Sequence, residues 1–175
     1  RSEISIMARL MIRASKMIEK TDQSVKFFMP LVDEKHRRFI PEDLDIDHIN
    51  FSYGDSQEVL SFSDLGIVTS GTVSLEALLL RTPVVVAYKT NWLNYAIIKP
   101  LLNTTHISLP NLLSDQDLLP ELLQREVTPK NIFKAYKKFD EDKIKVCLRE
   151  FEKIHSQLKA GGSEKASTAI SEIFK

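Results

Sequence analysis

The fold is decided by the stretch Leu65-Gly66-Ile67-Val68-Thr69-Ser70-Gly71-Thr72-Val73-Ser74-Leu75-Glu76. An apolar strand ends in Ser-Gly-Thr and runs directly into a predicted helix. Such a turn places free backbone N–H groups and the positive end of a helix dipole at the carboxyl edge of a parallel sheet. Phosphates bind well there, and open α/β sheets bind their ligands at this edge. The stretch therefore predicts an α/β fold with an anion site at the turn.

Four residues of this turn and the helix after it are candidate nucleotide ligands. Gly71 would let the backbone approach a ligand closely, and the hydroxyls of Ser70 and Thr72 can donate to phosphate oxygens. Glu76 lies one helical turn beyond Thr72, where its carboxylate can accept hydrogen bonds from two adjacent ribose hydroxyls. A plainer interpretation is that Ser70 or Thr72 only caps the helix and that Glu76 completes a capping pattern. The turn alone does not separate the two.

Strand and helix patterns alternate along most of the chain. Apolar positions recur at helical spacing from Ile4 to Ile18, which predicts a first helix. The strands are nearly all apolar and alternate with helices, so we expect a doubly wound parallel sheet that is covered on both faces. The predicted strands are 25–32, Ile49–Tyr53, Leu65–Thr69, Pro83–Tyr88 and His106–Leu109, and the helices between them are Gln57–Ser61, Val73–Leu80 and Leu93–Leu102.

The last third of the chain is expected to be helical. Asp117–Leu123 is predicted as a short helix, and Pro129 opens another, because proline is tolerated in a first turn. Asp140 starts a long charged helix with one apolar face, and Ser163 is placed to cap a final helix. We accordingly divide the chain into a domain at 1–139 and C-terminal helices at 140–175, which pack on that domain or cross to a partner domain.

Composition excludes several classes of function. The 24 basic and 24 acidic residues balance, which argues against a whole-domain attraction to nucleic acid. The only cysteine, Cys147, cannot form an internal disulfide and is expected as a small apolar residue on a helix. No apolar run approaches the roughly 18–20 residues that span a bilayer, and the first residues lack the apolar stretch of a signal peptide. A cytoplasmic setting with peripheral membrane contact is expected.

The first predicted element is a helix. A doubly wound sheet normally opens with a strand and a phosphate-binding loop, and no such pattern precedes Ile4. We therefore expect this chain to be part of a larger protein, without the first strand of its sheet.

Four motifs follow one another along the chain from the turn onward. They are Ser70-Gly71-Thr72-x-x-Leu75-Glu76-x-x-Leu79, Thr82-Pro83-Val84-Val85-Val86-x-Tyr88, Ser108-Leu109-Pro110-Asn111-Leu112-Leu113 and Glu121-Leu122-Leu123-Gln124-x-Glu126-x-Thr128-Pro129. In this order they resemble the C-terminal half of the lipid-A-disaccharide synthase family. The Ser-Leu-Pro-Asn-Leu-Leu segment is the most specific of them, whereas Ser-Gly-Thr-x-x-x-Glu turns occur more widely among GT-B glycosyltransferases.

This resemblance implies a Rossmann-like domain of a GT-B glycosyltransferase, the half that holds a UDP-diacylglucosamine donor. The acceptor would be a monosaccharide lipid phosphate and the product the lipid A disaccharide, with no metal or other cofactor. The general base is expected in the missing N-terminal domain, so this half alone would be inactive. The family works at the surface of the bacterial inner membrane, and the resemblance is compatible with a homodimer.

Two further positions follow from the family pattern. Asn111 matches the asparagine of Ser-Leu-Pro-Asn, and an amide after a strand end and a proline-containing turn can point into the cleft at the donor or acceptor site. An asparagine that caps its own local turn is the alternative. Tyr53 and Gly54 lie where related folds place loop backbone against uracil. The family's phosphate-site arginine is not carried over to Arg1, whose spacing from Glu3 differs by one residue.

Some alternatives remain open at this stage. The helix at 92–102 is apolar nearly all round and has Lys89 and Lys99 at its ends, which suits a membrane interface, although one side of it could simply pack on the sheet. A nucleotide-sugar epimerase half of the same fold and a non-catalytic nucleotide-binding module are the competing functions.

Overall fold

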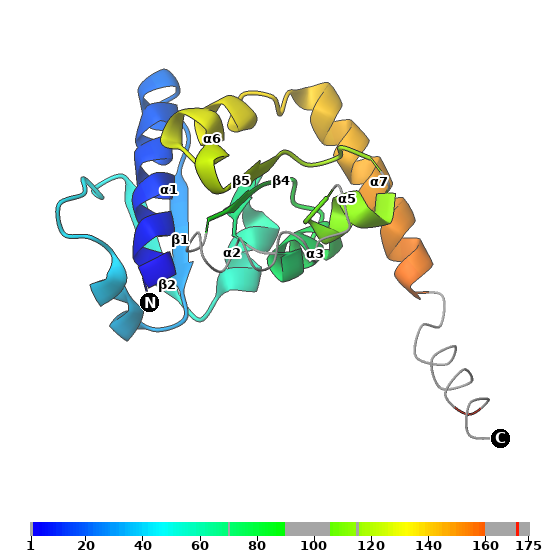
Figure 1. The fold of residues 1–175 in the computed structure, drawn as a ribbon, viewed down its shortest axis with the longest axis horizontal. Helices are drawn as coiled ribbons and strands as arrows, with labels where there is room; N and C mark the ends of the chain where they lie inside the picture. Colours follow the sequence, from blue (N-terminus) through cyan, green and yellow to red (C-terminus); the bar gives the residue numbers. More distant parts are fainter. Residues whose placement is uncertain (1, 70, 90–105, 115, 160–170, 172–175) are drawn as a thin grey trace.

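The computed structural model describes residues 2–69, 71–89, 106–114, 116–159 and 171 (Figure 1). Within these residues the chain is an α/β structure whose paired strands are all parallel, as predicted. The strands form two sheets where a single sheet was expected. The helix predicted at Leu93–Leu102 and the one predicted after Ser163 lie outside the described residues.

The smaller sheet consists of β1 (Phe27–Leu31) and β2 (Ile49–Tyr53). Phe27 lies opposite Ile49, and the register continues to the last residue of each strand. The connection between the two strands contains the 3-10 helix η1 (Glu34–Phe39), which begins where the Asp33 carboxylate accepts a hydrogen bond from the backbone N–H of His36. Both strands therefore end at the same edge of the sheet.

The larger sheet has the order β3 (Gly66–Val68), β4 (Val84–Tyr88) and β5 (Glu121–Leu123). The central strand β4 is the core of the molecule, because its residues 84–87 have no exposed surface. Successive side chains of a strand point to opposite faces, so such a continuous apolar run needs cover on both sides.

Helices supply that cover (Figure 1). On one face, α1 (Ser2–Thr21) and α6 (Pro129–Tyr136) pack through Met7, Ala14 and Ile132 against Ala87 of β4. On the other face, α3 (Gly71–Leu79) and α7 (Glu141–Lys159) pack on Val84 and Val86. Two shorter helices, α2 (Ser56–Phe62) and α5 (Leu109–Ser114), complete the described α-helices, and a short 3-10 helix, η3 (Gln124–Glu126), follows β5.

Local sequence signals account for the ends of the later helices. Pro129 occupies the first turn of α6, and the Thr128 hydroxyl accepts from the N–H of Asn131 (3.2 Å), as a capping threonine does. At the start of α7, Asp140 accepts from the N–H of Lys143 (2.8 Å). Cys147 is a buried, free cysteine of α7, and burial raises the pKa of its thiol. These three predictions are confirmed.

Two predicted elements are wrong. The segment His106–Leu109 is not a strand: residues 106 and 107 lie in a loop, and α5 begins at Leu109. The segment Asp117–Leu123 is not a helix: its last three residues form β5, and the carbonyl of Pro120 accepts from Val86 N (2.9 Å) as the ladder begins. Proline lacks the N–H that a helix interior requires, whereas an edge strand accepts it.

Helix α3 ends in a Schellman turn with an unusual residue. The N–H of Thr82 donates to the carbonyl of Ala77 (2.8 Å), and that of Arg81 donates to Leu78 (3.1 Å). This turn requires a left-handed residue, and Arg81 adopts φ 61° there. Glycine is the usual occupant, because a Cβ is strained in this region.

We expect Arg81→Gly to stabilise the chain by about 0.5–1 kcal/mol, because it removes the left-handed strain. The substitution also removes the ion pair of Arg81 with Glu152, whose side chains are 58% and 66% exposed, and such an exposed pair contributes little. Urea unfolding measures the change. Arg81→Ala is the matched control, since it loses the same ion pair and keeps the Cβ; an Arg81→Gly chain no more stable than Arg81→Ala would contradict the prediction.

Candidate functional site

The candidate nucleotide site is the start of α3, which follows the short strand β3. Gly71 is the first helical residue and Thr72 is exposed, whereas Ser74 is fully buried and donates its hydroxyl to the carbonyl of Gly71 (2.6 Å). The first turn of a helix presents N–H groups that have no intrahelical acceptor. Ser70 lies outside the described residues. The predicted strand–turn–helix is therefore confirmed on both sides of that residue.

Glu76 lies one turn further along α3 and is half-buried. The structure gives its carboxylate no hydrogen bond or ion pair with other described residues, and its oxygens are not among the buried atoms that lack a partner. Thr72 and Glu76 are four residues apart, so their side chains share one face of the helix. This geometry leaves both groups available to a ligand at the start of α3.

Gly71 is constrained by the chain itself. A Cβ at this position would lie 3.2 Å from the carbonyl oxygen of Ile107, which is tighter than ordinary van der Waals contact. The loop of residues 106–108 therefore packs directly against the first turn of α3. A larger residue at position 71 would therefore have to displace the Ile107 carbonyl by a few tenths of an ångström, whatever ligand the turn binds.

Glu121, at the start of β5, fixes that loop. Its carboxylate accepts hydrogen bonds from the backbone N–H of Ile107 (2.9 Å) and of Ser108 (3.0 Å), and from the Ser108 hydroxyl (2.6 Å). It accepts a fourth from the amide of Asn111 (2.8 Å). Ile107 and Ser108 directly precede α5, so the carboxylate lies at the N-terminal end of that helix, where the helix dipole favours a negative charge.

Asn111 lies inside α5 and is 1% exposed, which differs from the expected position after a strand end. Its amide nitrogen also donates to the carbonyl of Leu119 (2.9 Å), and its amide oxygen accepts from the N–H of the same residue (2.8 Å). The amide is thus occupied within the chain and does not point freely into a cleft. Glu121 is the residue of this group to which sequence reasoning gave no role.

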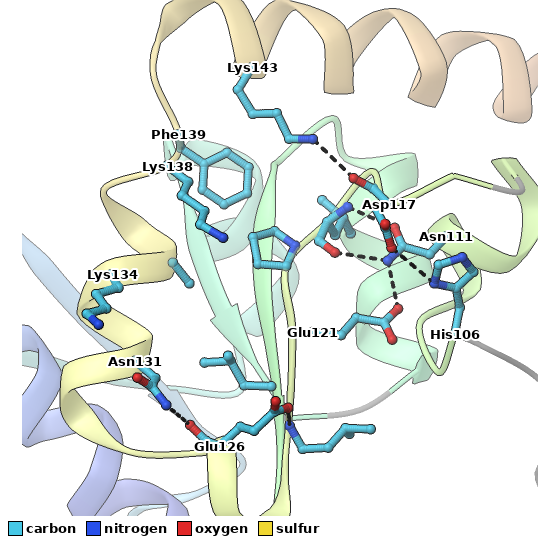
Figure 2. Close-up of a pocket in the computed structure, with 15 residues that line it drawn as sticks. His106, Asn111, Asp117, Glu121, Glu126, Asn131, Lys134, Lys138, Phe139 and Lys143 are labelled. Carbon is cyan, nitrogen blue, oxygen red and sulfur yellow. Dashed lines mark hydrogen bonds and ion pairs between the residues drawn. The ribbon is translucent and has the colours of Figure 1, made fainter.

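A cavity of about 640 Å³ lies on the outer side of this network (Figure 2). Asn111 and Glu121 form one wall with His106, and lysines of α6, α7 and the turn between them approach from the other side. Neither Gly71, Thr72 nor Glu76 lines it. The cavity is lined by His106, Asn111, Asp117, Leu119, Pro120, Glu121, Leu122, Leu123, Glu126, Asn131, Lys134, Ala135, Lys138, Phe139 and Lys143.

Tyr53 and Gly54 lie at the end of the smaller sheet. Tyr53 is the last residue of β2 and is 44% exposed. Gly54 adopts φ 74° and donates its N–H to the carbonyl of Leu31 (2.8 Å), which closes the ends of β1 and β2. No hydrogen bond or ion pair in the described part of the chain joins these two residues to Glu121 or to the start of α3. Their predicted contact with uracil stays a prediction.

Comparison with known proteins identifies the family. The family model described as lipid-A-disaccharide synthetase matches residues 1–173. The chain belongs to the lipid-A-disaccharide synthase family. Enzymes of this name are glycosyltransferases of lipid A biosynthesis. The named family matches the one that the four sequence motifs indicated.

Two curated relatives illustrate the match. The chain is 36% identical over 180 residues to the lipid-A-disaccharide synthase of Cellvibrio japonicus, with 99% of this chain and 47% of the relative covered. It is 33% identical over 174 residues to the enzyme of Idiomarina loihiensis, with 97% and 46% covered. The chain therefore spans about half the length of these relatives.

The described residues contain no group of three His, Cys, Asp or Glu side chains that could hold a metal ion. None of the described helices combines the length and apolar character needed to cross a bilayer.

We expect Asn111→Ala to destabilise the chain by about 2–4 kcal/mol, because it leaves the buried N–H and carbonyl of Leu119 and one acceptor position of the Glu121 carboxylate without a partner. Thr72→Ala should change stability by less than about 0.5 kcal/mol, because Thr72 is exposed. Urea unfolding of both variants measures this contrast. Equal stability of the Asn111→Ala chain and the unmodified chain would show that the amide is not a structural group.

Proposed function

We propose that this chain is the donor-binding half of a lipid-A-disaccharide synthase. It binds the UDP group of UDP-diacylglucosamine, and the sugar is transferred to a monosaccharide lipid phosphate supplied at the other half. Membership of the family gives the reaction class. One observation supports donor binding by this half: α3 begins directly after the parallel strand β3, with Gly71 in its first turn.

The chemistry of this turn suits a diphosphate. The N–H groups of the first turn and the positive end of the helix dipole attract phosphate oxygens, and the Thr72 hydroxyl adds a donor. Ser70, one residue earlier in the sequence, is proposed to donate in the same way. When the glycosidic bond to the diphosphate breaks, negative charge grows on UDP, so these donors also stabilise the leaving group. No metal is required for this stabilisation.

Glu76 is proposed to bind the ribose. A carboxylate offers two oxygens, and each can accept from one of the two adjacent ribose hydroxyls. Its position one turn beyond Thr72 supports this role, as does the absence of a hydrogen bond or ion pair from its carboxylate to any other described residue. Tyr53 and Gly54 are proposed to contact uracil, because they end β2 at the edge where ligands of parallel sheets bind.

Asn111 is proposed to hold the backbone around the site in place and not to contact the donor directly, because its amide is hydrogen-bonded to Leu119 and Glu121. The remaining parts of the machinery, including the general base and the acceptor site, are assigned to the partner domain. The whole enzyme has the two-domain GT-B arrangement with a Rossmann-like sheet in this half, and it acts at the cytoplasmic surface of the inner membrane. The helices after residue 139 pack on this domain or cross to its partner.

We expect the 175-residue chain to bind UDP and Glu76→Ala to weaken that binding by about 1–3 kcal/mol, the contribution of a charge-assisted hydrogen bond. Isothermal titration with UDP measures the dissociation constant. Glu141→Ala is the control, because its carboxylate is 91% exposed at the start of α7, away from α3. The thermal midpoint of the Glu76→Ala chain should stay close to that of the unmodified chain.

Two results would contradict this function. An unmodified chain with no measurable affinity for UDP would remove the donor site from this half. Equal UDP affinity in the Glu76→Ala and Glu141→Ala chains would show that α3 does not hold the ribose. Disaccharide synthesis is expected only when the other half of the enzyme is added, and synthesis by this chain alone would show that the catalytic groups are misassigned.

A further inference from the structure

The loop of residues 106–108 lies between two parts of the fold that are distant in sequence. On one side, the Glu121 carboxylate of β5 accepts hydrogen bonds from two consecutive N–H groups of the loop, those of Ile107 and Ser108. On the other side the Ile107 carbonyl lies against Gly71, so that even a methyl group would not fit without displacement. The loop thus connects the β5 carboxylate to the first turn of α3.

We propose that Glu121 is a positioning residue of the nucleotide site. It holds the 106–108 backbone at a fixed distance from Gly71, and this backbone packs against the first turn of α3 and so fixes one side of the nucleotide site. Glu121 itself touches no substrate. This inference rests on the proposed function, since it concerns how the UDP site keeps its shape.

The hydrogen bonds of Glu121 are suited to this task. All four of its partners are donors, so only a group with no N–H of its own can satisfy them together. Two of the partners, Ser108 and Asn111, are almost fully buried, and hydrogen bonds of buried groups to a charged acceptor are strong and directional. One carboxylate oxygen accepts three of these bonds and the other accepts from the N–H of Ile107. A glutamine at 121 has nearly the same shape and can keep the three bonds with its amide oxygen, but its N–H2 group then faces the N–H of Ile107. It therefore displaces the loop at Ile107 without opening a cavity.

Within the described residues, the N–H groups of Ile107 and Ser108 donate only to Glu121. α5 contains only six residues, and a helix this short does not hold its own first turn in place. Release of the N–H groups of Ile107 and Ser108 therefore moves the Ile107 carbonyl relative to Gly71. Because the phosphates bind at that turn, the displacement reaches them without any change in the residues that contact UDP.

The first experiment needs no nucleotide. Backbone amide resonances of the 175-residue chain are compared by NMR with those of Glu121→Gln and Glu121→Ala. The resonances of Gly71 and Thr72 should shift in both variants, in addition to those of Ile107 and Ser108. Glu126→Gln is the matched control: Glu126 is a second glutamate near β5, with a single weaker bond to the N–H of Leu123 (3.3 Å), and it should leave Gly71 and Thr72 unchanged.

The second experiment measures UDP affinity by isothermal titration. The dissociation constant should rise roughly tenfold in Glu121→Gln and change little in Glu126→Gln. Ile132→Val serves as a control for stability, because Ile132 is fully buried in the cluster beneath α1 and its loss of a methyl lowers the thermal midpoint without touching the loop. If Glu121 had only a structural role, the Glu121→Gln and Ile132→Val chains would bind UDP equally well.

A third variant tests the path of the effect. Ser108→Ala removes one donor to Glu121 and should weaken UDP binding by a smaller factor. In the Glu121→Ala background the same substitution should have no further effect on UDP affinity, because its partner is already gone. Additive effects of the two substitutions would overturn the proposed path.

The outcomes separate this inference from the proposed function. Unchanged resonances at Gly71 and Thr72 in both Glu121 variants overturn the positioning role, whether or not UDP binds. UDP affinity in Glu121→Gln equal to that in Glu126→Gln overturns it as well. An unmodified chain that does not bind UDP contradicts the proposed function, and the comparison of resonances alone then decides whether Glu121 controls the first turn of α3.

Discussion

The packing of α1 is the contact on which the two-sheet structure depends. Met7 and Ala14 of this helix enter the cluster over the larger sheet, whereas Ala8 and Ile12 enter the cluster around Met29 and Phe51 of the smaller sheet. One helix thus presents two neighbouring apolar faces, which its wide apolar stripe permits. Two ion pairs add to this contact: Arg9 binds Asp43, and Lys16 binds Asp45, in the loop that precedes β2. The hydrogen bonds of these pairs lower the pKa values of Asp43 and Asp45.

Polar groups near the start of α3 divide into two kinds. Ser74, Asn111 and Glu121 have all found partners inside the chain, so they determine shape. Thr72 and Glu76 have been left accessible on one face of the helix, so they can exchange water for a ligand at low cost. Groups that are hydrogen-bonded within the chain hold the backbone in place, and Thr72 and Glu76 are then positioned to bind a ligand. Such an arrangement keeps a binding site preorganised.

Patterns that depend on near neighbours were predictable from the sequence. α1 and α7 each carry an apolar stripe, and the start of α6 carries both a capping threonine and a proline, so these helices form as expected. The strand–turn–helix at Gly71 was recognised for the same reason, because the apolar strand, the turn and the helix are contiguous. The division into two sheets was not predictable in this way, since strand pairing is decided by contacts across long sequence distances.

The two wrong elements show where local reasoning fails. The apolar positions of 117–123 repeat as on a helix face, but Pro120 cannot donate within a helix, and its carbonyl instead begins the ladder with β4. His106–Leu109 alternates like a strand, yet the N–H groups of Ile107 and Ser108 donate to the Glu121 carboxylate, so these two groups are not available to a sheet. The two segments are linked: once residues 121–123 pair with β4, the Glu121 carboxylate lies next to the 106–108 loop and takes the N–H groups of Ile107 and Ser108. A single long-range contact therefore determines the structure of both segments and the wall of the candidate site.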